Sequence, residues 1–139
     1  MPVIAIVGNK GGAGKTTLSV NLAAGLAKSS SIALVDADPQ GSASTWRAVA
    51  NNEAVPVYAA SEELEALTRD LVQDYDYVVI DCPPSVQSPQ TTTVLRIGNL
   101  ALIPVQPSPV DLWASVHIER AIAQAQETNP SLRALLVIN

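Results

Sequence analysis

One stretch near the start of the chain limits the possible folds more than any other. Residues 8–17 read Gly-Asn-Lys-Gly-Gly-Ala-Gly-Lys-Thr-Thr, directly after an apolar run and before leucines at helical spacing. A glycine-rich loop between a strand and a helix that starts with Lys-Thr is the context of a phosphate-binding loop. The backbone N–H groups of such a loop can surround an anion, and the helix N-terminus adds partial positive charge. We therefore predict that Lys15 reaches the outer phosphates and that the Thr16 hydroxyl binds Mg²⁺.

The loop departs from the usual phosphate-binding pattern at two positions. Asn9 stands where the pattern has its first glycine, and a second lysine, Lys10, lies inside the loop. The alternative is a glycine-rich turn with incidental lysines. The position of the loop, its flanks and the Gly-Lys-Thr-Thr run favour phosphate binding.

Short apolar runs and helical patterns alternate along the remainder of the chain. We expect strands at residues 3–7, 31–36, 56–59, 77–81, 100–105 and 132–138. We expect helices at residues 16–28, 42–51, 91–97 and 112–127, and another capped by Ser61 with Glu62 and Glu63 in its first turn. Hydrophobic residues make up 47% of the chain and aromatic residues only 4%, so Val, Ile, Leu and Ala must fill the core, as in a buried parallel sheet. The order predicts one three-layer α/β domain over residues 1–139, a P-loop NTPase fold with a mainly parallel sheet.

Carboxylates follow two of the predicted strands. Asp36 ends one strand and Asp38 follows it, and Asp81 ends another strand. Ligands of parallel sheets bind beyond the carboxyl ends of the strands, where Gly8 and the loop at residues 106–111 also belong. One member of the Asp36 and Asp38 pair could hold Mg²⁺ and the other could orient an attacking water, whereas the alternative is a polar turn. Asp81 is expected to bind Mg²⁺ directly or through water.

Charge and cysteine content exclude several classes of protein. The net charge is −5, which argues against a nucleic-acid footprint over the whole domain. Cys82 is the single cysteine, so an internal disulfide is excluded and a reducing cytosol is favoured. Its neighbours favour a small buried residue over a nucleophile. No apolar run approaches the length of a membrane span.

Four segments resemble one known family. The run Lys-Gly-Gly-Ala-Gly-Lys-Thr at residues 10–16 resembles the deviant Walker A motif of the ParA/MinD ATPases. Asp-Ala-Asp-Pro-Gln at residues 36–40 resembles their switch I segment, in the form typical of the ParA branch. Residues 78–84 resemble their Walker B motif and the start of switch II. Pro-Val-Gln-Pro-Ser-Pro at residues 104–109 is similar to a loop of the small, ParF-like partition proteins.

The resemblance implies a site for ATP or ADP with Mg²⁺ and a slow, partner-stimulated ATP hydrolysis. It implies that Lys10 reaches the phosphates of a second subunit, that Lys15 holds the β and γ phosphates, and that Asp38 positions the hydrolytic water. Thr16, Asp36 and Asp81 would hold the Mg²⁺. The remaining nucleotide contacts would come from the phosphate loop and the start of the helix: Gly11, Gly12, Ala13, Gly14 and Thr17.

The resemblance also implies a cellular role. Such ATPases form homodimers on binding ATP, respond to a small activator or adaptor protein, and bind DNA without sequence specificity. They position plasmids, chromosomes or protein cargo over the nucleoid, in the cytoplasm and away from the membrane. Family members continue well past 139 residues, so we expect a C-terminally shortened domain. Two alternatives stay open, a nucleotide-binding module without turnover and a MinD-like membrane-surface switch, whereas an iron–sulfur relative would need more cysteines.

Overall fold

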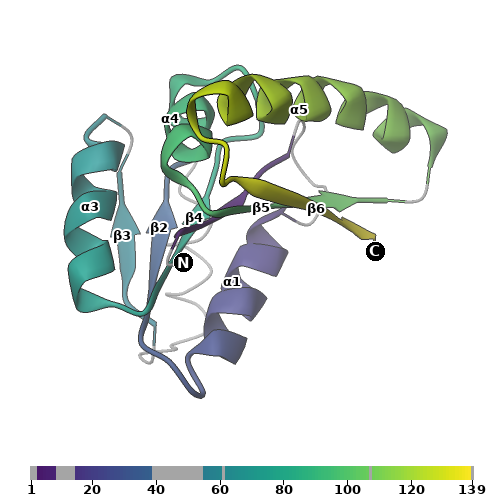
Figure 1. The fold of residues 1–139 in the computed structure, drawn as a ribbon. Helices are drawn as coiled ribbons and strands as arrows, with labels where there is room; N and C mark the ends of the chain where they lie inside the picture. Colours follow the sequence, from purple (N-terminus) through teal and green to yellow (C-terminus); the bar gives the residue numbers. More distant parts are fainter. Residues whose placement is uncertain (1–2, 9–14, 39–54, 61, 107, 139) are drawn as a thin grey trace.

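The computed structural model describes residues 3–8, 15–38, 55–60, 62–106 and 108–138. Within these residues, six strands form one sheet in the order β3-β2-β4-β1-β5-β6, and all of the strand pairs are parallel (Figure 1). The elements in chain order are β1 (Val3–Ile6), α1 (Lys15–Leu26), β2 (Ile32–Asp36), β3 (Val57–Ala59), α3 (Leu64–Asp74), β4 (Tyr77–Asp81), α4 (Pro89–Ile97), β5 (Leu100–Val105), α5 (Pro109–Thr128) and β6 (Arg133–Ile138).

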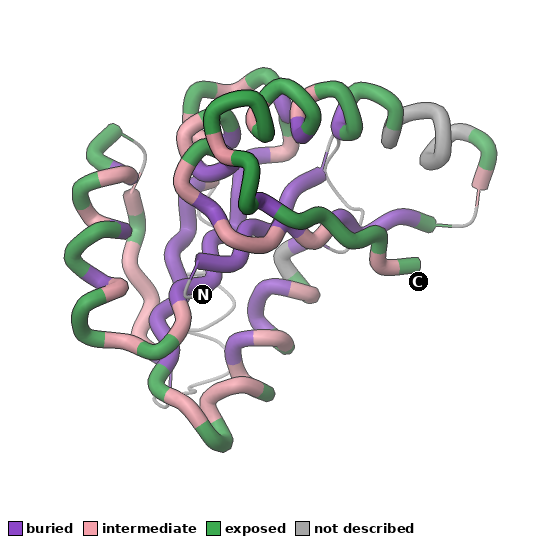
Figure 2. The backbone as a smooth tube through the Cα atoms, in the orientation of Figure 1, coloured by how far each residue is buried: buried purple, intermediate pink, exposed green. Residues whose placement is uncertain are grey.

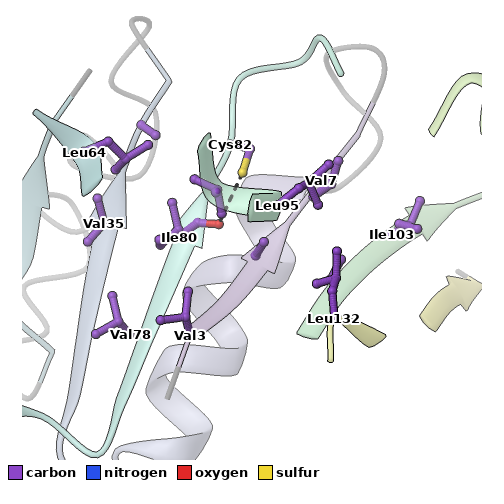
Figure 3. Close-up of a cluster of buried hydrophobic side chains, with 14 of the residues drawn as sticks. Val3, Val7, Val35, Leu64, Val78, Ile80, Cys82, Leu95, Ile103 and Leu132 are labelled. Atoms are coloured by element: carbon purple, nitrogen blue, oxygen red, sulfur yellow. Dashed lines mark hydrogen bonds between the residues drawn. The ribbon is translucent and has the colours of Figure 1, made fainter. Parts of the chain in front are cut away.

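Helices cover both faces of the sheet. Helix α1 packs on one face, and α3, α4 and α5 lie on the other (Figure 1). Side chains along β1 alternate between the two faces, as the two-residue period of a strand requires. Val3 and Ala5 join a cluster with Leu95 of α4, part of which is drawn in Figure 3, whereas Ile4 joins a cluster with Val20 of α1. The buried strands consist mainly of Val, Ile, Leu and Ala, in agreement with the predicted core.

The described helices begin at different residues than the sequence predicts: α1 begins at Lys15 rather than at residue 16, and α5 begins at Pro109 rather than at residue 112. Helix α4 begins at Pro89 rather than at residue 91, because the Ser88 hydroxyl caps it by accepting a bond of 3.1 Å from the backbone N–H of Thr91. Proline is favoured in the first turn, where its missing N–H is not needed. Helix α3 begins at Leu64, so Glu62 and Glu63 precede its first turn. The predicted cap Ser61 and the predicted helix at residues 42–51 lie outside the described residues.

None of the helices in the described part of the chain is long and apolar enough to span a membrane. The longest, α5, has 20 residues and carries charged side chains along its length. Its buried residues, such as Ile118 and Ile122, pack in the hydrophobic cluster that also holds Val3 and Ala5 of β1.

Two glycines provide a matched test of the packing around α4. A Cβ atom at Gly98 would lie 2.8 Å from the backbone oxygen of Val94, whereas a Cβ atom at Gly25 of α1 would meet nothing within 4 Å. We expect Gly98→Ala to lower the free energy of unfolding by about 1–3 kcal/mol, because the clash involves backbone. Gly25→Ala should raise it by about 0.5–1 kcal/mol, since alanine favours a helix. Urea unfolding measures both changes, and equal changes in the free energy of unfolding for the two variants would contradict the close contact at Gly98.

Candidate functional site

The carboxyl ends of three adjacent strands bring the predicted site residues together. Strand β4 lies between β1 and β2, and Asp81 at its end is in register with Ile6 of β1 and with Asp36 of β2. The backbone ladder continues one residue further, because the N–H of Ala37 donates to the backbone carbonyl oxygen of Asp81 at 3.0 Å. Asp36 and Asp81 are both buried, with 2% and 0% of their surface exposed. Two carboxylates are therefore fixed side by side at the edge where parallel sheets bind ligands.

Lys15 reaches this edge from the first residue of α1. Its Nζ donates a hydrogen bond of 2.7 Å to Oδ1 of Asp81, and only 5% of the Lys15 side chain is exposed. The aliphatic part of Lys15 passes beside Gly8, where a Cβ atom would lie 3.4 Å from Cδ. The buried hydroxyl of Ser19, one helical turn further, donates to the Lys15 carbonyl oxygen at 2.9 Å. The chain thus holds an ammonium group directly against a buried carboxylate.

Two hydrogen bonds fix the turn after β2, one within the turn and one to the residue that follows β3. The backbone N–H of Asp38 donates to Oδ1 of Asp36 at 3.1 Å, and the N–H of Ala60 donates to the Asp36 carbonyl oxygen at 3.1 Å. These bonds place Asp38, which is half-buried, just beyond the buried carboxylate of Asp36. Asp38 is therefore held at the rim of the site rather than in its floor.

The structure describes some of the predicted nucleotide-binding residues and not others. Thr16 and Thr17 belong to the first turn of α1, and Thr17 is exposed. Lys10, Gly11, Gly12, Ala13 and Gly14 lie outside the described residues. The loop after β5 is described on either side of residue 107. There the backbone N–H of Ser108 donates to the backbone carbonyl oxygen of Gln106 at 2.8 Å.

Asp36 and Asp81 provide carboxylate oxygens of the kind that Mg²⁺ takes as ligands. The described ranges contain no group of three or more His, Cys, Asp or Glu side chains that could hold a metal ion. Mg²⁺ in nucleotide sites takes one or two protein ligands and completes its six with water and phosphate oxygens. Asp36 and Asp81, in register on adjacent strands, match this smaller donor set.

Cys82 follows Asp81 and is fully buried. Burial raises the pKa of its thiol to about 12, and the negative charge of Asp81 adds to the shift. A thiol of this pKa is protonated at neutral pH and is a poor nucleophile. The structure therefore agrees with the sequence interpretation of Cys82 as a packing residue.

The raised pKa of Cys82 predicts a fall in stability at alkaline pH. The thiol stays protonated in the folded chain but ionises in the unfolded chain, so the stabilisation is complete below about pH 9 and is lost as the pH rises toward 12. We expect a disulfide reagent at pH 8 to label Cys82 quickly in urea and hardly at all in the folded protein. In Cys82→Ala, the cysteine-dependent part of the alkaline loss should disappear. Rapid labelling of the folded chain would contradict the burial.

Sequence reasoning missed two features of the site. It assigned Lys15 to phosphates and Asp81 to Mg²⁺ but did not predict that the two side chains bind each other, 66 residues apart. It also gave no role to Ser19. The one feature of the sequence that could have indicated its contact with Lys15 is the four-residue spacing, which is about one helical turn.

Comparisons with known proteins identify the chain's relatives. The family model of the CobQ/CobB/MinD/ParA nucleotide binding domain matches residues 4–139. The maintenance of carboxysome distribution protein A of Halothiobacillus neapolitanus is 43% identical over 140 residues, an alignment that covers 98% of this chain and 65% of that protein. The chromosome-partitioning ATPase Soj of Thermus thermophilus is 32% identical, with 97% of this chain and 67% of Soj covered. This chain therefore spans less than two thirds of the carboxysome protein's length.

A solved structure supports the same fold. Cobyrinic acid a,c-diamide synthase from Mycobacterium smegmatis, determined with a bound ATP analogue and magnesium, superposes with a TM-score of 0.84 at 24% identity. The superposition covers 99% of this chain and 74% of the synthase chain. At this level of identity the likeness shows the fold alone, and it confirms the three-layer P-loop architecture predicted from the sequence.

Proposed function

Because this chain belongs to the CobQ/CobB/MinD/ParA nucleotide-binding family, we propose that it binds ATP with Mg²⁺ and hydrolyses it to ADP and phosphate. The observation that carries the proposal is the 2.7 Å contact between Lys15 and Asp81 at the carboxyl edge of the sheet. It joins the lysine that follows the glycine-rich loop to the carboxylate that ends β4. The group proposed to bind phosphate and the group proposed to bind Mg²⁺ are therefore within hydrogen-bonding distance of each other.

We propose the following roles from the family resemblance and from the positions of these residues in the chain. Lys15 binds the β and γ phosphates from the start of α1, where the helix dipole also favours an anion. Thr16 and Thr17, in the same turn, bind Mg²⁺ and the α phosphate. Asp36 and Asp81 orient the Mg²⁺ shell from the floor of the site. Bound Mg²⁺ supplies charge neutralisation at the phosphates, which with positioning accounts for most of the catalysis of phosphoryl transfer.

Binding requires Lys15 and Asp81 to change partners together. Lys15 Nζ is bonded to Asp81 Oδ1, and both side chains are buried. If Lys15 turned to a phosphate without a cation replacing it, Asp81 would lose its ammonium partner inside the protein, which costs several kcal/mol. We therefore infer that ATP binds this chain much more tightly with Mg²⁺ than without it.

The cellular role is proposed from the relatives. The names of the two aligned proteins refer to carboxysome distribution and to chromosome partitioning. We propose that ATP binding drives a homodimer in which Lys10 contacts the partner subunit's nucleotide, and that a small activator protein stimulates hydrolysis. The cycle would position a plasmid, chromosome or protein assembly over the nucleoid in the cytoplasm, through non-specific DNA binding. Lys10 lies outside the described residues, so this part depends on the family relationship.

Asp38 provides the test of hydrolysis. We propose that it positions the attacking water from the rim of the site, so Asp38→Ala should lower the rate of phosphate release at saturating Mg²⁺ and ATP by about 100-fold or more. Asp70→Ala, which removes an exposed carboxylate on α3, should leave the rate unchanged. Wild-type release no faster than that of Asp38→Ala, with ATP binding retained, would show a nucleotide-binding module without turnover.

A further inference from the structure

The segment between β4 and α4 leaves the sheet beside Asp81. Strand β4 ends at Asp81 and helix α4 begins at Pro89, so residues 82–88, which we call the exit segment, start at the carboxyl edge that holds the candidate site. Figure 2 shows the chain passing from buried to exposed between β4 and α4. The course of the exit segment therefore decides which groups lie next to Asp81 at that edge.

Two consecutive prolines make the exit segment depend on its anchors. Its first residue, Cys82, is held by the sheet, because its N–H donates to the backbone oxygen of Ile6 at 3.1 Å. Pro83 and Pro84 follow, and neither has an N–H to donate. Proline also fixes φ, so this pair is stiff. The course of the stretch is therefore set by the sheet at one end and by the groups that hold Ser85 at the other.

Thr91 of α4 holds the far end of this stretch. Its hydroxyl donates to the Ser85 carbonyl oxygen at 3.0 Å and accepts from the Ser88 hydroxyl at 2.9 Å. The N–H of Ser88 also donates to the Ser85 oxygen, at 3.3 Å, and Ser88 is itself bonded to the N–H of Thr91 at 3.1 Å. Because Thr91 is fully buried, its hydroxyl forms these bonds without competition from water. One hydroxyl thus ties the exit segment to α4.

We propose that Thr91 is a positioning residue for ATP hydrolysis, which it serves by holding Ser85 and so fixing the exit segment beside Asp81. This inference rests on the proposed function. Lys15 and Asp81 have supports of their own, in α1 and in the strand ladder, so nucleotide binding does not need the Thr91 hydroxyl. Hydrolysis needs closer placement than binding, since a displacement of about 1 Å can slow a reaction about 100-fold. A loosened exit segment should therefore slow turnover more than it weakens binding.

Cys82 reports on the exit segment without any nucleotide, because it is the single cysteine and is buried. Thr91→Val removes the hydroxyl and keeps the branched shape. We expect it to speed labelling of the folded protein by a disulfide reagent about tenfold or more, at a rate that dilute urea does not change, as for a local opening. Thr91→Ser keeps the hydroxyl and should label like the wild type. So should the matched control Thr92→Val, whose exposed hydroxyl bonds to the Ser88 carbonyl oxygen.

Phosphate release with Mg²⁺ and ATP tests the role of Thr91 at the site. Thr91→Val should lower kcat about tenfold and leave KM for ATP within about twofold of the wild type, whereas Thr91→Ser and Thr92→Val should keep both values. A wild type without turnover would remove the proposed function and this inference with it. Wild-type turnover with an unchanged kcat in Thr91→Val would overturn the inference alone. So would equal labelling of Thr91→Val and the wild type, a labelling rate that rises with urea as global unfolding does, or an equal loss of kcat in Thr91→Ser.

Discussion

Substituting Lys15 with alanine is expected to lower ATP turnover by at least about 100-fold and to remove measurable binding of Mg²⁺ and ATP. The side chain places its ammonium group at the carboxyl edge of the sheet, where the proposed phosphates need positive charge. Losing one such group that stabilises developing negative charge typically costs two to three orders of magnitude in rate. Phosphate release and equilibrium titration with a fluorescent ATP analogue measure the two effects.

Two controls separate the loss of the amine from a loss of folding. Lys28→Ala removes an exposed lysine just after α1 and should bind and hydrolyse ATP as the wild type does. Lys15→Ala combined with Asp81→Asn removes both charges of the pair, so this double variant should fold and still fail to bind. Retained binding by Lys15→Ala would contradict the assignment of this lysine to the phosphates.

The second large effect is on stability. Lys15 and Asp81 form an ion pair whose side chains are 5% and 0% exposed, so removing either partner takes away the counter-charge of a buried group. We expect Lys15→Met and Asp81→Asn each to lower the free energy of unfolding by about 3–5 kcal/mol. Lys15→Met combined with Asp81→Asn should lose much less free energy of unfolding than the sum of the two single losses, because both charges of the pair are gone. Urea unfolding without Mg²⁺ or nucleotide measures the cycle, and additive losses would mean that the two side chains do not interact.

Much of the fold could be predicted because strand ends are visible in the sequence. Buried parallel strands read as short apolar runs, so Asp36 and Asp81 could be recognised as residues that close such runs. Parallel strands place their carboxyl ends at one edge, which predicted that these carboxylates would be near each other. The structure agrees, with the two residues in register.

The remaining features depend on which elements become neighbours. The Lys15 contact with Asp81 arises because β4 inserts between β1 and β2, and nothing local at either residue indicates that order. The apolar run of β6 resembles the buried runs, and within the described residues the strand pairs with β5. The start of α4 had a local signal in Ser88-Pro89, a cap followed by proline, which the apolar pattern alone did not capture.

The most direct test of the central claim, a joint site for ATP and Mg²⁺ at the edge that holds Lys15 and Asp81, is calorimetric titration of the 139-residue chain with ATP. The titration is run with Mg²⁺ and then with a chelator. The proposal predicts one ATP bound per chain with Mg²⁺ and much weaker binding without it, and it predicts that Asp81→Asn loses most of this Mg²⁺ dependence. Equal affinity with and without Mg²⁺ in the wild type, or no binding in either buffer, would contradict it.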